Sequence, residues 1–258
     1  MPGERVILVG DTGGRIHSFV AALGRFPDEP PWVVVGGFAV NVRISQVHRL
    51  TNDLDTISAQ QAELVEVLLA QPDADRLEYA KLRFTSEHPA VDIDVMDDTA
   101  AHPLPAEPSD RAVALARRYA MLTREELAVV VTEAGKVTVE TSAPVASVAG
   151  LVALKSVSMP RRSASNRPEK VASDVHDLVR LTEGRDLDAL AQVLATTEVE
   201  LAHWVGDMLV RWFSADADQR YTLMRLRRLS GALDAQTIDE DALTFVAVLG
   251  QALLDGLA

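Results

Sequence analysis

The chain has 258 residues, a formal net charge of −13 and no cysteine. The lack of cysteine excludes disulfides, thiolate zinc sites and cysteine nucleophiles. The negative charge argues against non-specific nucleic-acid binding through the whole surface. No apolar run suits a secretory signal or a membrane span, so we expect a soluble cytoplasmic protein without membrane contact.

The first part of the chain alternates predicted strands and helices. The run WVVVGG ends in two glycines and is typical of a buried strand, whereas AQQAELVEVLLAQ has helical spacing. LVGDTGG at 8–14 is a strand and turn, since it lacks the ending of a phosphate loop. The pattern predicts a strand at 32–37, a loop opening a short helix at 36–48, a strand at 54–59 and a helix at 59–71.

Two hairpins and a helix follow. Residues 75–86 and 90–96 alternate apolar and polar side chains around a turn at 87–89, and residues 126–142 form a second hairpin that turns at EAGK. Between them we expect a surface loop at 97–110 and a helix at 110–122, with Asp110 as its N-cap.

From Pro144 onward only helical spacing is found, and this proline suits the first turn of a helix. We expect four to six helices there. The predicted class is therefore α+β: a mixed β-sheet domain with helices at 1–142, then an all-helical domain at 143–258.

Two Asp-x-Asp pairs stand on predicted strands. Asp53 and Asp55 share one strand face at about 7 Å between their Cα atoms, and Leu54 points into the core. Asp92 and Asp94 repeat the pattern. Paired carboxylates repel unless a cation such as Mg²⁺ lies between them. If one sheet holds both pairs, they could form the two-metal cluster of a phosphoryl transfer; otherwise they are solvated strand faces.

The paired glycines Gly36 and Gly37 have no Cβ, so their backbone N–H groups could approach a phosphate closely. A helix starting at about Phe38 would add a favourable dipole for an anion. The alternative is an ordinary tight turn.

Residues 36–58, GGFAVNVRISQVHRLTNDLDTIS, resemble the first signature of the DNA polymerase β-type nucleotidyltransferase superfamily. That signature is Gly-Gly or Gly-Ser, a short helix and Asp-x-Asp. The spelling is closest to the AbiEii branch, which includes toxins of bacterial toxin–antitoxin pairs and the MenT-type toxins. The matching positions are Gly36, Gly37, Ala39, Asn41, Arg49, Thr51, Asp53, Leu54 and Asp55.

Residues 143–181 are similar to the later signature of the same branch. There a helix ending in Lys precedes an Arg-bearing loop and Asp-x-x-Asp-Leu. The matching positions are Lys155, Arg162, Arg167, Asp174 and Asp177. Ser173 stands where the branch often has Lys, and Lys170 lies earlier. The resemblance covers roughly residues 30–182, and residues 183–258 match nothing recognised.

Lys155 can also be interpreted from its own spacing. It extends the apolar stripe of its helix, where a lysine is unusual unless it meets an anion. A simple salt bridge to Asp174 would satisfy it equally well.

The resemblance implies a Mg²⁺-dependent nucleotidyltransferase that uses two ions, with Mn²⁺ as an alternative, and an NTP such as ATP. Asp53, Asp55 and Asp94 would ligate metal, with Asp94 favoured over Asp92 because IDVM has the family's apolar-Asp-apolar-apolar form. Lys155 and Asp174 would complete the catalytic set. Gly36, Gly37, Arg49, Thr51 and Lys155 would serve the phosphates.

Three hypotheses on the function stay open: two of them name an acceptor, and the third assumes no reaction. The resemblance implies RNA, at the 3′ end of tRNA, with an antitoxin protein as partner. Aminoglycoside-modifying enzymes share the core, and a charge of −13 suits a cationic drug. An inactive NTP-binding module is the third, against which the intact acids argue. The candidate RNA contacts are Arg161, Arg162, Arg167 and Lys170, which otherwise form a solvated loop and helix face.

Overall fold

The computed structural model describes residues 4–165, 168–214, 222, 226 and 238–257. The chain divides into two compact units, of which the first comprises residues 1–103 and 120–147 and the second residues 104–119 and 148–258. In the described part, no helix has both the length and the hydropathy needed to cross a membrane.

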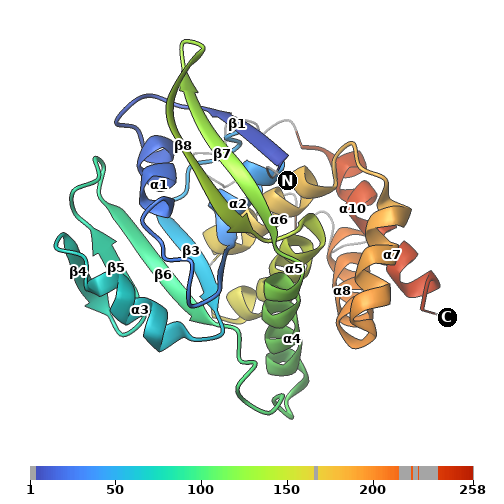
Figure 1. Ribbon diagram of the computed structural model, residues 1–258. Coiled ribbons are helices and arrows are strands. Elements are labelled where there is room, and N and C mark those ends of the chain that lie inside the picture. The colour runs from blue at the N-terminus through green and yellow to red at the C-terminus, as the bar shows by residue number, and fades with distance from the viewer. Residues whose placement is uncertain (1–3, 166–167, 215–221, 223–225, 227–237, 258) are drawn as a thin grey trace. The chain divides into compact units, whose positions relative to one another are not determined.

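The first unit is built on an eight-stranded mixed sheet in the order β1-β7-β8-β2-β3-β6-β5-β4. Short runs of β-branched residues form its inner strands, because such side chains pack well on a pleated surface. Figure 1 shows the sheet with its helices α1 (Arg15–Leu23), α2 (Gly36–Arg43) and α3 (Gln61–Leu69). The strands are β1 (Glu4–Val9), β2 (Trp32–Val34), β3 (Asp53–Ser58), β4 (Ala74–Glu78), β5 (Lys81–Phe84), β6 (Val91–Asp97), β7 (Glu125–Glu133) and β8 (Lys136–Val145).

The alternation predicted for β3 and β6 is confirmed. Leu54 on β3 and Val91, Ile93 and Val95 on β6 are fully buried, whereas the aspartates between them are partly exposed. These strands therefore bury one face in the core and present the other as a row of carboxylates.

The described residues of the second unit are largely helical. Its helices are α5 (Val148–Ala164), α6 (Pro168–Thr182), α7 (Leu187–Thr197), α8 (Val199–Phe213) and α10 (Glu240–Asp255), together with α4 (Pro108–Leu122) as far as Tyr119. On α6, Val171, Val175 and Leu178 are fully buried, which confirms the predicted apolar stripe. The α+β class is therefore confirmed.

Four predictions of local structure were wrong or incomplete, and the fourth concerns the N-cap of α4. Residues 75–86 are not one strand: Glu78 pairs with Lys81, so the chain reverses at Tyr79–Ala80, which carries no Gly, Asn or Pro to signal a turn. Helix α1 was missed. Pro144 does not open a helix, because it lies on β8 opposite Glu126, and α5 begins only at Val148.

Asp110 is not an N-cap. Helix α4 begins at Pro108, which places Asp110 within the first turn. The cap comes from Glu107, whose carboxylate accepts hydrogen bonds from the backbone N–H of Asp110 at 2.8 Å and from the hydroxyl of Ser109 at 2.5 Å. The proline fits this first turn because its missing N–H would have no helical partner there.

Candidate active site

The two acidic pairs lie side by side in the sheet, as the shared-sheet hypothesis required. Strands β3 and β6 are parallel, and their register sets Asp53 beside Asp92 and Asp55 beside Asp94. Neighbouring strands are about 4.8 Å apart. The four aspartates therefore lie close together on one face of the sheet, as two pairs that each join β3 to β6. The sequence predicted the pairs, but the pairing of the strands decides which acid faces which.

Asp92 is engaged by an arginine from the next strand. Arg83 on β5 stands directly opposite Asp92 in the register. Its Nε donates to Asp92 Oδ1 at 2.5 Å and its Nη2 to Oδ2 at 3.0 Å. This hydrogen-bonded ion pair lowers the pKa of Asp92 and raises the pKa of Arg83. Arg83 was not singled out from the sequence, although alternation in KLRF and the predicted hairpin placed it on the acidic face.

Gly36 lies against the carboxylate of Asp55. Its φ is +71°, and a Cβ built there would overlap the Asp55 carboxylate, with Asp55 Cγ 2.7 Å away. The neighbouring Val35 donates its N–H to the backbone oxygen of Asp55 at 2.9 Å. Only glycine combines this conformation with so close an approach. The turn at Gly36 and the position of Asp55 therefore depend on each other.

Arg49 covers the second glycine. A Cβ on Gly37 would meet the guanidinium, with Arg49 Cζ 2.9 Å away. The first turn of α2 therefore brings together bare backbone N–H groups and a guanidinium, both of which suit a phosphate.

The loop that carries Arg49 is fastened to α2 by a buried asparagine. Asn41 is fully buried, and its Oδ1 accepts hydrogen bonds from the backbone N–H of His48 at 3.3 Å and from Nδ1 of the same residue at 2.6 Å. Its amide nitrogen donates to the backbone oxygen of Arg49 at 3.3 Å. His48 therefore carries its proton on Nδ1. In the sequence Asn41 was only a matching position, and His48 was interpreted as a surface or core residue because the histidines show no metal-ligand spacing; it is buried.

The hydroxyl of Thr51 contacts Asp53, and the side chain of Thr51 is buried. Its hydroxyl donates to the backbone oxygen of Asp53 at 3.2 Å and approaches Asp53 Oδ1 at 3.4 Å. The threonine is 7% exposed. These contacts tie Thr51 to the first residue of β3.

The donor set fits a hard cation that is shared with phosphate. No group of three or more His, Asp or Glu side chains in the described residues is arranged to hold a metal ion alone. Mg²⁺ is usually held by one or two carboxylates together with waters and substrate phosphates. Asp53, Asp55 and Asp94 carry carboxylate oxygens of this kind, and the backbone of Gly36 lies against the Asp55 carboxylate.

The later of the two signatures lies in the second unit as a buried ionic cluster. The side chain of Lys155 is 7% exposed, and its Nζ lies 2.6 Å from Asp177 Oδ2 and 3.2 Å from Asp174 Oδ1. Both carboxylates are fully buried. Asp174 also pairs with Arg162 and accepts a hydrogen bond from Ser158 at 2.7 Å. The salt bridge considered from the sequence is therefore present, and Asp177 joins it.

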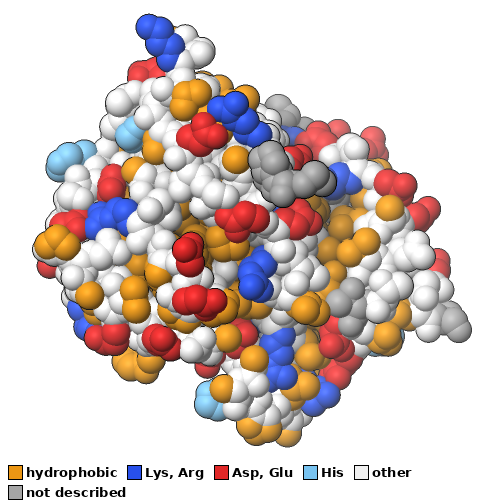
Figure 2. Space-filling view, in the orientation of Figure 1, with side chains coloured by type: hydrophobic (Ala, Val, Ile, Leu, Met, Phe, Trp, Pro, Cys, Tyr) orange, Lys and Arg blue, Asp and Glu red, His pale blue; other side chains and the backbone are white. Residues whose placement is uncertain are grey.

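The residues proposed to contact RNA lie in different settings. Arg161 pairs with Asp110 at 2.7 Å, and Arg162 pairs with Asp174. Lys170 is exposed, and Arg167 lies outside the described residues. Acidic and basic side chains are interspersed on the face shown in Figure 2.

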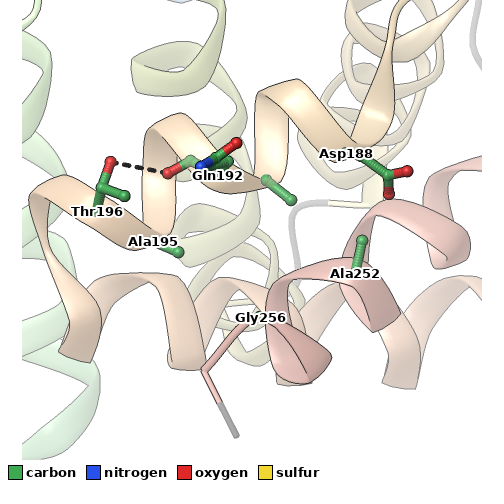
Figure 3. Close-up of a pocket in the computed structure, with 7 residues that line it drawn as sticks. Asp188, Gln192, Ala195, Thr196, Ala252 and Gly256 are labelled. Carbon is green, nitrogen blue, oxygen red and sulfur yellow. Dashed lines mark hydrogen bonds between the residues drawn. The ribbon is translucent and has the colours of Figure 1, made fainter.

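A cavity of about 360 Å³ lies between α7 and α10. Figure 3 shows its lining, where the Thr196 hydroxyl donates to the backbone oxygen of Gln192 at 2.8 Å. The lining holds one carboxylate, Asp188, and no basic side chain among the described residues. It therefore offers no counter-charge to a triphosphate, and the acidic rows of β3 and β6 remain the better candidate site.

Comparison with known proteins identifies the family of the chain. The family model described as nucleotidyl transferase AbiEii toxin, type IV TA system, matches residues 18–253. No curated protein and no solved structure gave a match. The matched region contains every candidate residue above and extends beyond residue 182, where the recognised resemblance ended. The chain therefore belongs to the AbiEii nucleotidyl transferase toxin family.

Proposed function

We propose that the protein transfers a nucleoside monophosphate from an NTP to an acceptor hydroxyl and releases pyrophosphate. The observation that carries this proposal is the register that sets Asp55 beside Asp94, with Gly36 forced to be glycine by the same carboxylate. Membership of a nucleotidyl transferase family supports the reaction class.

Each candidate residue of the first unit has a separate role in the proposed reaction. The backbone N–H groups of Gly36 and Gly37 bind the β- and γ-phosphates, and Arg49 neutralises their charge. Asp94 accepts the proton of the acceptor hydroxyl, whose oxygen bonds to the α-phosphorus as the bond to the pyrophosphate oxygen breaks. Asp53, Asp55 and Asp94 would hold Mg²⁺, which supplies charge stabilisation to the transferring phosphoryl group.

Lys155 and Asp174 are proposed as the contribution of the second unit. The ammonium of Lys155 is held in position between two buried carboxylates, those of Asp174 and Asp177. The resemblance to the later signature assigns Lys155 and Asp174 to the catalytic set, in which Asp174 and Asp177 would orient the lysine. Truncating the lysine would also leave both carboxylates buried without their cation, so activity and stability must be measured together.

The acceptor is proposed to be RNA, at the 3′ end of tRNA, and an antitoxin protein would relieve the resulting growth arrest. The toxin family supports this choice, and exposed Lys170 and the half-exposed Arg161 are candidate backbone contacts. A cationic aminoglycoside is the second candidate, favoured by the net charge of −13.

The test uses each α-labelled NTP with Mg²⁺ or Mn²⁺ and either total tRNA or an aminoglycoside panel. The Asp53→Ala, Asp55→Ala double variant runs beside an Asp28→Ala, Glu29→Ala control, which loses the same charge from exposed positions. We expect label on tRNA with wild type and control and none with the acidic-site variant. Label on a drug would move the protein to the resistance class. Absence of metal-dependent NTP binding by calorimetry would refute the nucleotidyltransferase proposal.

A further inference from the structure

We propose that Arg15 is a positioning residue of the acidic site: its guanidinium bridges the backbone at the starts of β3 and β6 and so holds the first pair of aspartates, Asp53 and Asp92, in register. This inference rests on the proposed function, in which acids of these strands bind a metal ion. Arg15 was not singled out from the sequence, because helix α1 was not predicted.

One nitrogen of Arg15 contacts the chain ahead of both strands. Its Nη1 donates hydrogen bonds to the backbone oxygen of Asn52 at 3.4 Å and to that of Ala90 at 3.3 Å. Asn52 directly precedes β3, and Ala90 directly precedes β6. An Nη of a guanidinium carries two hydrogens, so one nitrogen can serve two carbonyls. Arg15 therefore spans the two strands at the point where their pairing begins.

The end of the ladder is where such a bridge matters most. The parallel pairing of β3 with β6 runs from Asp53–Asp92 to Ser58–Asp97. Asp53 is also the first residue of its strand. The ends of secondary-structure elements open more readily than their centres. The first acidic pair therefore lies where the ladder would open first, and Arg15 fastens the residues directly before it.

The charge of Arg15 gives no advantage that would explain its place. Arg15 is the first residue of α1, where the helix macrodipole disfavours a positive charge. The charge also acts on the acidic face: the pKa of Asp92 is lowered mainly by the hydrogen bond from Arg83, and the charges of Lys81 and Arg15 add to this. A cation there opposes the approach of a metal ion. The bridge between the strands, in contrast, depends directly on the donors of Arg15.

Aromatic packing connects Arg15 to the helix that carries the glycine turn. Its Cζ lies 5.9 Å from the ring centroid of Phe19, one turn further along α1. Phe19 is fully buried and packs edge to face on Phe38 of α2, with ring centroids 5.3 Å apart. The first turn of α2 begins at Gly36. Helix α1 therefore contacts α2 through Phe19 and the starts of β3 and β6 through Arg15.

The experiment compares Arg15→Met with wild type in the full chain. Amide hydrogen exchange followed by NMR reports opening along β3 and β6, and electron paramagnetic resonance of free Mn²⁺ reports metal binding. The matched control is Arg5→Met, because Arg5 lies in the same unit but pairs with Glu140 at 3.1 Å on another part of the sheet. Urea denaturation of both variants checks that the fold is retained.

We expect Arg15→Met to speed exchange roughly three- to tenfold at residues 53–55 and 91–94, as the loss of hydrogen bonds at a strand end would do. Exchange at residues 57–58 and 96–97 should change less than about twofold. The dissociation constant for Mn²⁺ should rise roughly tenfold, whereas loss of the charge alone would lower it. Arg5→Met should change none of these values.

Three results would overturn the inference. Unchanged exchange at the two strand starts would remove the bridge. An equal increase at both ends of the ladder would report general destabilisation instead of opening at Arg15. Tighter Mn²⁺ binding by Arg15→Met would show that its charge outweighs any positioning of the acids.

Label transfer from NTP, measured on the same proteins, separates this inference from the proposed function. Transfer by wild type that stays unchanged in Arg15→Met, together with unchanged exchange, refutes only the role of Arg15. Faster exchange confined to the strand starts, in a protein whose wild type transfers no label, would support the bridge and refute the proposed reaction.

Discussion

Replacement of Gly36 by alanine tests whether the glycine turn and Asp55 form one feature. The position has φ +71°, and the new Cβ would overlap the Asp55 carboxylate, with Asp55 Cγ at 2.7 Å and Cβ at 2.8 Å. A Cβ essentially never comes within 3.0 Å of another heavy atom, and these atoms belong to a short side chain on a central strand. The substitution therefore has to displace Asp55 or the turn.

The magnitude follows from two contributions. A left-handed conformation costs a residue with a Cβ roughly 1–2 kcal/mol. Forcing an extra carbon into a packed site adds about 1–3 kcal/mol. We therefore expect Gly36→Ala to lower the free energy of unfolding by about 2–5 kcal/mol. A displacement of Asp55 by about 1 Å should reduce nucleotide transfer roughly 100-fold.

The control is Gly135→Ala on the β7–β8 turn. Gly135 has φ +77°, but nothing lies within 4 Å of the point that its Cβ would occupy. It should lose only the conformational contribution of roughly 1–2 kcal/mol and retain activity. Urea denaturation and α-labelled NTP transfer are measured on both variants. Equal destabilisation of the two, with transfer retained in Gly36→Ala, would refute the reasoning.

Three other predictions concern buried polar groups and ion pairs. Asn41→Ala should destabilise by about 1–3 kcal/mol and raise the KM for NTP more than it lowers kcat; an unchanged KM would contradict its role in placing Arg49. Lys155→Met should cost about 3–5 kcal/mol by urea denaturation, and full stability would refute the buried ion cluster. The Arg25 hydrogen bond lowers the pKa of Asp73 below its usual 3.8, so the stability that this pair contributes above the usual pKa is lost as the pH falls through the folded pKa. In Asp73→Asn the free energy of unfolding should therefore fall less at acid pH than in wild type, as urea denaturation at several pH values would measure. An unaltered pH profile would disprove the contribution of this pair.

The candidate site motifs could be found in the sequence because they depend on local spacing. A period of two put Asp53 with Asp55 and Asp92 with Asp94, and two glycines after a β-branched run indicated a turn that needs no Cβ. The hairpin at 79–80 was missed, since neither Tyr79 nor Ala80 carries a turn signal. Local patterns therefore found the strands and the acids, but they failed where the chain reverses without Gly, Asn or Pro.

The amino-acid sequence by itself determined the acidic pairs, the glycine turn, the buried lysine and the α+β class, because each follows from residue type at fixed spacing. Only the tertiary structure decided that β3 and β6 are adjacent and parallel in a register that pairs Asp55 with Asp94. It also decided that Arg83 binds Asp92 and that Lys155 binds Asp177. These contacts join residues that are distant along the chain or on different elements, and strand order and helix packing, which no local pattern encodes, bring them together.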